Sequence, residues 1–144
     1  MLSKIFLTGL LVAVSVAIHA AGVTAALAWL PRWSRARHAP LGWTWLFTRV
    51  AGWMILLHVC EIATWGLYYH WTGAIPGWQT AFYFSGVTYT TTGYGDIVLP
   101  PPWRLVGAVE ALTGILMCGW STGFFFAIVS RVQAARAPGV GERW

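Results

Sequence analysis

The sequence predicts an all-α integral membrane protein with three transmembrane helices and one short re-entrant helix in each subunit. Of its 144 residues, 58% are hydrophobic and only 9% are charged, whereas an ordinary soluble domain carries about 25% charged residues. Three apolar stretches are long enough to cross a bilayer as helices, which takes about 20 residues each. The net charge of +5 therefore reflects basic residues that set membrane topology, and it does not indicate nucleic-acid binding.

The three predicted spans cover 5–30, 45–70 and 104–132. We expect the first to end at Pro31, and we expect Pro100, Pro101 and Pro102 to stop any earlier helix from continuing into the third span, because proline interrupts helical hydrogen bonding. The chain then divides into a peripheral N-terminal helix and loop (1–44), a central domain (45–132) and a short cytoplasmic tail (133–144).

Basic residues orient these spans. Arginines flank the first connection and follow the third span: Arg32, Arg35, Arg37, Arg49, Arg131, Arg136 and Arg143. The positive-inside rule places the 31–44 loop and the C-terminus in the cytoplasm, with the N-terminus and residues 71–103 outside. We therefore predict a multi-pass protein of the plasma or inner membrane.

Residues 1–25 could alternatively be a cleaved signal peptide, with Lys4 preceding an apolar run. The run continues through Leu30 and is longer than the usual signal-peptide core. Cleavage would also reverse the orientation of the later spans, against the distribution of arginines. We favour a retained helix.

Residues 71–103 are too polar to form another span. A short helix is predicted at 76–90, with proline at its start, and "TTGYGD" follows at 91–96. Irregular backbone at membrane depth is tolerated only where protein buries it or where it lines a wet pathway. Gly93 and Gly95 can adopt the left-handed conformation at alternate positions, which points successive carbonyl oxygens toward one axis. The Thr91 hydroxyl can add a further oxygen, so this segment suits a dehydrated cation.

This segment resembles the T-V-G-Y-G-D selectivity filter of the potassium channel superfamily. The surrounding "AFYFSGVTYTTTGYGDIVLPPPWRLVGAVEALTGI" is similar to the pore helix, filter and inner helix of bacterial pore-only channels of the two-transmembrane, pore-loop type, here with an extra N-terminal helix. The resemblance implies a K⁺-selective channel that conducts K⁺ passively, with K⁺ as the permeant ligand and no cofactor. A ring of carbonyls needs four such loops, which predicts a four-fold symmetric homotetramer embedded in membrane lipid.

The resemblance also implies roles for individual residues. The K⁺-binding residues are Thr91, Thr92, Gly93, Tyr94 and Gly95, the last of which shapes the outer mouth, and Asp96 caps that mouth. Thr92 replaces the usual valine, so a weakly selective monovalent cation channel is the alternative. Tyr83, Phe84 and Val87 replace the residues that often tether the outer-mouth aspartate, so that tether is either missing or supplied otherwise.

The third span carries candidates for the gate. Gly114 lies where related inner helices often have a hinge glycine. Four residues share a stripe at helical spacing, Ile115, Cys118, Thr122 and Phe126, which is typical of either a pore lining or a packing face. If the stripe lines the conduit, Phe126 is the hydrophobic constriction. Cys60 and Cys118 are expected to be buried, unpaired thiols.

Three ionisable residues lie within the spans: His58, Glu61 and Glu110. Such groups are costly in lipid and are functional candidates. His58 and Glu61 share a helix face and could bind a metal, but we favour structural hydrogen bonding, with pH sensing as an intermediate hypothesis and no metal beyond K⁺. Glu110 is expected to hydrogen-bond near the rear of the 76–90 helix. An accessory channel subunit and a metalloenzyme are the rival classes, and beyond that His–Glu pair nothing in the sequence favours an enzyme.

Overall fold

The computed structural model describes residues 2–34 and 40–136, which contain helices and no strand. The helices are α1 (Leu2–Ser34), α2 (Pro40–Trp71), α3 (Trp78–Tyr89) and α4 (Arg104–Arg136), with the 3₁₀ turn η1 (Pro101–Trp103) before α4. Among the described residues, α1, α2 and α4 are long and apolar enough to cross a membrane. The predicted all-α membrane fold is confirmed.

Several helix boundaries differ from the prediction. The first span does not end at Pro31, because α1 continues to Ser34. Proline has a φ angle that suits a helix, and near the helix end it removes only one backbone hydrogen bond. The second helix begins earlier than predicted, at Pro40, since proline is favoured in the first helical turn. The short helix α3 begins at Trp78, with Gly77 as its N-cap.

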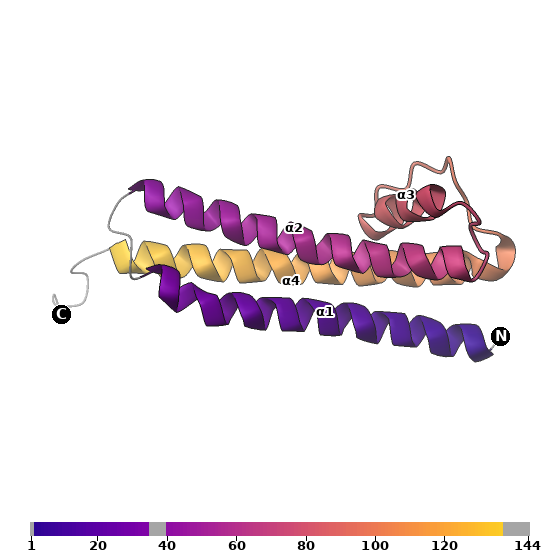
Figure 1. Cartoon of the computed structure of the whole chain (residues 1–144), viewed down its shortest axis with the longest axis horizontal. Coiled ribbons are helices and arrows are strands. Elements are labelled where there is room, and N and C mark those ends of the chain that lie inside the picture. The colour runs from indigo at the N-terminus through magenta and orange to yellow at the C-terminus, as the bar shows by residue number, and fades with distance from the viewer. Residues whose placement is uncertain (1, 35–39, 137–144) are drawn as a thin grey trace, which may run out of the picture.

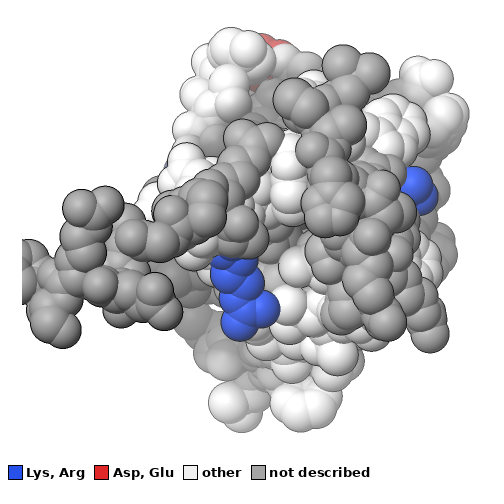
Figure 2. All heavy atoms as spheres, turned by 90° about the vertical axis from the view of Figure 1, so that its left-hand side faces the viewer, with Lys and Arg blue, Asp and Glu red and all other residues white. Residues whose placement is uncertain are grey.

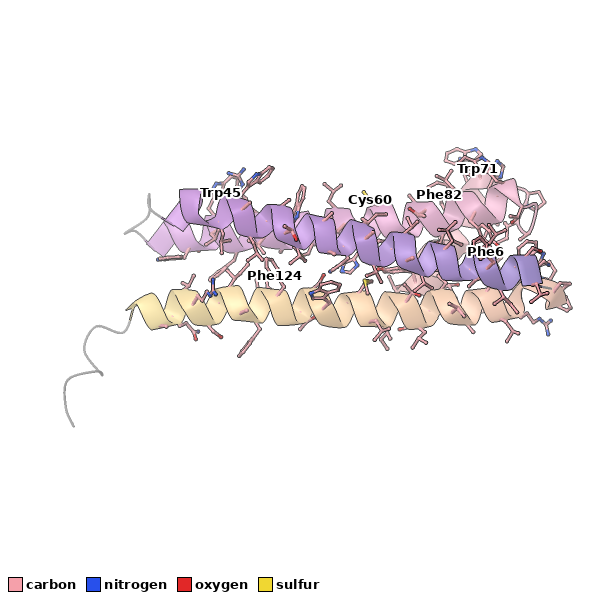
Figure 3. The ribbon with its side chains drawn as sticks, turned by 90° about the horizontal axis from the view of Figure 1, so that it is seen from below. Phe6, Trp45, Cys60, Trp71, Phe82 and Phe124 are labelled. Carbon is pink, nitrogen blue, oxygen red and sulfur yellow. The ribbon has the colours of Figure 1, made fainter. Side chains whose placement is uncertain are left out.

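The three long helices lie along one common axis (Figure 1). The short helix α3 packs against both α2 and α4, at the end of the molecule where α1 begins (Figure 1). The N-terminal end of α1 and the segment that follows α3 therefore lie at the same end, as the predicted topology requires. Trp45 and Trp71 lie near opposite ends of α2 (Figure 3).

The opposite end of the molecule carries basic side chains among uncharged ones (Figure 2). Arg131 lies in the last part of α4 and is exposed. Of the predicted cytoplasmic residues, Arg35, Arg37 and Arg143 lie outside the described residues, as do positions 137–144 of the predicted tail.

An apolar cluster fixes α3 against the long helices. Trp65 and Tyr69 of α2 and Ala81 of α3 are each 0% exposed, and Phe84 and Met117 complete the contact between α3 and α4. Since lipid tails are as apolar as the protein interior, this cluster is stabilised by close van der Waals packing. The backbone that follows α3 therefore begins from a rigid base.

Polar contacts hold α1 against α2. The indole Nε1 of Trp65 donates to Ser15 Oγ at 3.1 Å, and the indole Nε1 of Trp53 donates to the Gly22 carbonyl at 2.9 Å. These two contacts lie on either side of His19 along α1. They set the rotation of α1 so that His19 points into the bundle.

Candidate functional site

The segment from Thr91 to Asp96 directly follows α3 and its C-cap residue, Thr90. Its backbone has positive φ angles at alternate residues: 58° at Thr91, 50° at Gly93 and 78° at Gly95. The alternation predicted from the two glycines is present, and it extends one step further, to Thr91. Successive peptide groups in such a segment can present their carbonyl oxygens toward the same side.

The positive φ angle of Thr91 was not predicted from the sequence. A β-branched residue with positive φ is a genuine outlier, and such strain costs about 1–3 kcal/mol. Two hydrogen bonds to the end of α3 offset part of that cost. The Thr91 N–H donates to the Thr88 carbonyl at 2.9 Å, and the Gly93 N–H donates to the Val87 carbonyl at 3.0 Å.

The carbonyl oxygens of residues 91–95 remain available. Among the described residues, no backbone N–H outside the helices donates to any of them, and all six residues of the 91–96 segment are exposed on the single subunit. Carbonyl oxygens at membrane depth need a partner, because an unsatisfied polar group costs several kcal/mol there. A cation, water or a neighbouring subunit can supply it.

Asp96 is tethered by a residue of α3. The Tyr83 hydroxyl donates to Asp96 Oδ2 at 2.8 Å, so the tether comes from Tyr83 itself, one of the three positions from which the sequence predicted it to be missing or supplied otherwise. This hydrogen bond to Asp96 raises the pKa of Tyr83 above its usual value of 10.0. The bond requires the protonated phenol, so it persists at neutral pH and is lost only as pH rises well above the usual tyrosine range.

The Tyr83→Phe variant tests this tether. It removes the only hydroxyl in contact with Asp96 among the described residues while keeping the ring on α3. If the segment conducts ions, as its resemblance to a channel filter implies, ion flux should persist at first but decline faster during sustained conduction, because the outer end of the segment loses its anchor. Flux time courses from vesicles check this expectation, with Phe82→Tyr as a control on the same helix. Equal time courses for Tyr83→Phe and the parent would contradict it.

Thr92 faces the end of α3. Its hydroxyl lies 2.9 Å from the Thr90 hydroxyl, and the Thr90 hydroxyl in turn donates to the Gly86 carbonyl at 2.7 Å. The hydroxyl of Thr92 is therefore engaged by the helix that precedes the segment.

Glu110 of α4 lies behind α3, where the sequence predicted it. Its side chain is 0% exposed. Glu110 Oε2 accepts from the Tyr69 hydroxyl at 2.7 Å, and Oε1 lies 2.5 Å from Ser85 Oγ. Ser85 also donates to the Ile62 carbonyl at 2.8 Å. Glu110 thus joins α2, α3 and α4 at the base of the candidate segment.

A second group of polar residues has members on α1, α2, α3 and α4. It consists of His19, His58, Glu61, Tyr89 and Ser121, and we call it the His–Glu cluster. His19 Nδ1 lies 2.9 Å from Glu61 Oε1, and the Tyr89 hydroxyl donates to Glu61 Oε2. His58 Nδ1 lies 3.2 Å from the Tyr89 hydroxyl and 3.6 Å from Glu61 Oε2.

Ser121 closes the His–Glu cluster from the side of α4. Its Oγ lies 3.1 Å from His19 Nε2, 3.0 Å from His58 Nε2 and 3.6 Å from Met54 Sδ. His19, Glu61 and Tyr89 are 0%, 0% and 1% exposed. Tyr89 is the last residue of α3, so the cluster connects α1 to the start of the 91–96 segment.

Sequence reasoning found His58 and Glu61 but missed His19 and Ser121. A signal for His19 was available, because a histidine within an apolar span is as costly as an acidic residue. The centroid of the Trp120 ring lies 5.2 Å from that of the His19 ring. Ser121 gave no signal, since a lone serine in a membrane helix is common.

Gly114, the predicted hinge, lies against the end of α3. A Cβ atom at this position would stand 2.0 Å from the Tyr89 carbonyl oxygen. This glycine is therefore required for close packing, in addition to any hinge role. The four residues of the predicted stripe, Ile115, Cys118, Thr122 and Phe126, are all exposed on the subunit, which leaves that face of α4 open to a pore or to a neighbouring subunit.

Both cysteines are unpaired, as predicted, but the prediction that they are buried is wrong for the single subunit. Cys60 and Cys118 are free and exposed, and Cys60 points away from α4 (Figure 3). The reason is that a membrane helix can leave apolar side chains facing lipid or a neighbouring subunit, since lipid tails are as apolar as the protein interior.

A family model described as "ion channel" matches residues 55–131, just over half of the chain. The matched range includes the C-terminal part of α2, all of α3, the 91–96 segment and most of α4. It leaves out α1. Searches of curated proteins and of solved structures found no significant match.

Proposed function

The chain belongs to the ion channel family that its residues 55–131 match, and from this premise we propose that it is a K⁺-selective channel. In this proposal Thr91–Asp96 is the selectivity filter and K⁺ is the permeant ligand. The protein conducts K⁺ down its gradient, is not an enzyme and needs no cofactor. The 45–132 region is the pore domain, with α3 as its pore helix.

The alternating backbone of residues 91, 93 and 95 is the observation that carries the proposal. Positive φ angles at these three positions suit a row of carbonyl oxygens that replaces the hydration shell of a cation. Main-chain oxygens bind the ion without adding formal charge, so it can also leave again. The proposed ligands are the carbonyls of Thr91, Thr92, Gly93 and Tyr94, together with the Thr91 hydroxyl.

The orientation of α3 supports a cation pathway. Its C-terminal end leads into the filter, and a helix C-terminus carries a partial negative charge of roughly half an elementary charge. Among the described residues, the first turn of α3 carries no acidic side chain and the last turn no basic one, so the side chains of these turns do not compensate the dipole. The negative end of the α3 dipole favours a cation on the cytoplasmic side of the filter.

A homotetramer follows from the filter chemistry. One chain supplies one 91–96 segment, whereas a ring of oxygens around an ion needs four. The exposed filter and the exposed stripe on α4 then face the central axis. We place the N-terminus and the filter mouth outside the cell membrane and the C-terminus in the cytoplasm.

Reversal potentials test the function directly. Purified protein reconstituted in vesicles or planar bilayers, under opposed K⁺ and Na⁺ gradients, should reverse near the K⁺ equilibrium potential. The same protein in mild detergent should have a mass near four times 15.9 kDa. Reversal near zero voltage would overturn K⁺ selectivity, and a conducting monomer or dimer would overturn the tetramer.

A weakly selective cation channel is the second candidate, because Thr92 stands where valine is usual in the resembled family. The contact of the Thr92 hydroxyl with Thr90 favours a side chain that faces the protein and not the ion. Thr92→Val should therefore leave the K⁺ preference equal or improved in the same measurement. A non-conducting accessory subunit is disfavoured, since such a partner would not need a strained Thr91 or alternating glycines.

A further inference from the structure

We propose that the His–Glu cluster binds a divalent transition-metal ion of the Zn²⁺ class, with His19, His58 and Glu61 as ligands. Each of these residues offers one ligand atom, and the three atoms lie within 4.8 Å of one another. The site joins α1 to α2. It lies outside the proposed K⁺ pathway and does not depend on K⁺ selectivity.

The distances suit a small metal ion. Zn²⁺ binds imidazole nitrogen and carboxylate oxygen at about 2.0–2.2 Å in tetrahedral geometry, which places neighbouring ligand atoms about 3.3–3.5 Å apart. His19 Nδ1 lies 2.9 Å from Glu61 Oε1, and His58 Nδ1 lies 3.6 Å from Oε2 of the same carboxylate. Small side-chain adjustments would therefore admit the ion.

With both histidines neutral and Glu61 ionised, the His–Glu cluster is one proton short of the number that its contacts need. Five close contacts each need one proton: His19 to Glu61, Tyr89 to Glu61, His58 to Tyr89, and Ser121 to each histidine. Two neutral imidazoles, one phenol and one serine hydroxyl supply four protons, and a carboxylate supplies none. One contact then joins two lone pairs in a buried site, which is unfavourable.

A metal ion at the two Nδ1 atoms removes this conflict. Both Nε2–H groups then donate to Ser121 Oγ, which has two lone pairs, and the Ser121 hydroxyl donates to Met54 Sδ at 3.6 Å. The Tyr89 hydroxyl still donates to the carboxylate oxygen of Glu61. Every proton has an acceptor, and Ser121 orients both imidazoles as the outer hydrogen-bond partner that metal-bound histidines usually have.

The ligand types select the metal. Two imidazoles with one carboxylate suit Zn²⁺, Co²⁺ or Ni²⁺, whereas Mg²⁺ and Ca²⁺ prefer oxygen ligands alone. The His58 side chain is 18% exposed while those of His19 and Glu61 are 0% exposed, so the ion would enter past His58. Given the proposed function, occupancy would also stiffen Tyr89 and the base of the filter.

Metal binding to tag-free, full-length protein in detergent tests this proposal. After incubation with Zn²⁺ and desalting, elemental analysis should find about one Zn²⁺ per subunit, and Co²⁺ should give the intense visible absorption of a tetrahedral site. His19→Gln and His58→Gln should weaken binding more than tenfold, and Ser121→Ala about 10–100-fold. His70→Gln, on α2 but outside the cluster, should bind as the parent does.

Parent protein that retains no more Zn²⁺ than His19→Gln would overturn the proposal, whether or not the protein conducts K⁺. So would a cluster that binds no metal and instead holds an imidazolium, visible by NMR of ¹⁵N-labelled histidine. Because these readouts use no ion flux, their failure is distinguishable from failure of the proposed channel function. Circular dichroism of each variant checks that its helices are intact.

Discussion

Gly114→Ala is expected to prevent formation of a stable conducting assembly. The new Cβ would stand 2.0 Å from the Tyr89 carbonyl oxygen and 2.8 Å from the Tyr89 carbonyl carbon. Both are backbone atoms, so no side-chain rotation relieves the clash, and α4 must move away from α3. Overpacking of this kind costs about 1–3 kcal/mol, occasionally more.

The surroundings of Tyr89 prevent an easy adjustment. Its ring is 1% exposed and its hydroxyl is held by Glu61 and His58. A shift of the Tyr89 backbone would also displace Thr91, only two residues later, where the strained filter conformation begins. A displacement of Tyr89 would therefore also displace the proposed ion ligands, which begin at Thr91.

Size-exclusion chromatography and vesicle flux check this prediction. Gly114→Ala should lose most of the tetramer peak and at least tenfold of the flux. Gly52→Ala is the matched control, since a Cβ at Gly52 meets nothing within 4 Å in the subunit. If Gly114→Ala forms normal tetramers and changes only the open probability, Gly114 acts as a hinge, and the packing interpretation is wrong.

Much of the fold could be predicted because its determinants are local. The lengths of the apolar runs set three membrane helices, and the prolines at 100–102 set the start of α4. The spacing of Gly93 and Gly95 predicted the alternating backbone before any contact was known. The end of α1 and the start of α2 were predicted wrongly, because the helices extend to Ser34 and back to Pro40.

The polar interior could be predicted only in part. Glu110 lies on α4, the α-helix that follows α3 in the chain. Its approach to α3 could therefore be predicted from the order of the elements. The His–Glu cluster depends instead on the rotation of α1, which brings together His19 and Glu61, 42 residues apart, and His19 and Ser121, 102 residues apart. Sequence spacing carries no information on such a rotation, because it is set by the contacts of Trp53 and Trp65 with α1.

Glu110→Leu is expected to destabilise the pore, whereas Glu110→Gln should preserve it. Leucine leaves the buried Tyr69 hydroxyl, which donates to Glu110 at 2.7 Å, without its acceptor. An orphaned buried donor costs about 1–3 kcal/mol in each subunit. In the proposed tetramer this loss occurs four times, at the rear of every pore helix.

Glutamine can satisfy every contact of the site. Its amide oxygen can accept from Tyr69, and its amide nitrogen can donate to Ser85 Oγ, the position that lies 2.5 Å from Glu110 Oε1. Ser85 then keeps its single proton for the Ile62 carbonyl at 2.8 Å. In contrast, an ionised Glu110 and the Ile62 carbonyl would compete for that one proton. The neutral amide therefore mimics a protonated carboxyl group.

Thermal stability of the tetramer in detergent and K⁺ flux in vesicles separate the two variants. Glu110→Gln should match the parent in both measurements, and Glu110→Leu should lose tetramer at lower temperature and conduct less. Tyr69→Phe removes the hydroxyl that leucine orphans, so adding it to Glu110→Leu should recover part of the lost stability. Parent-like behaviour of Glu110→Leu alone would make the residue a bystander. Loss of function in Glu110→Gln as well would mean that the negative charge itself, and not the hydrogen bonding, supports the pore helix.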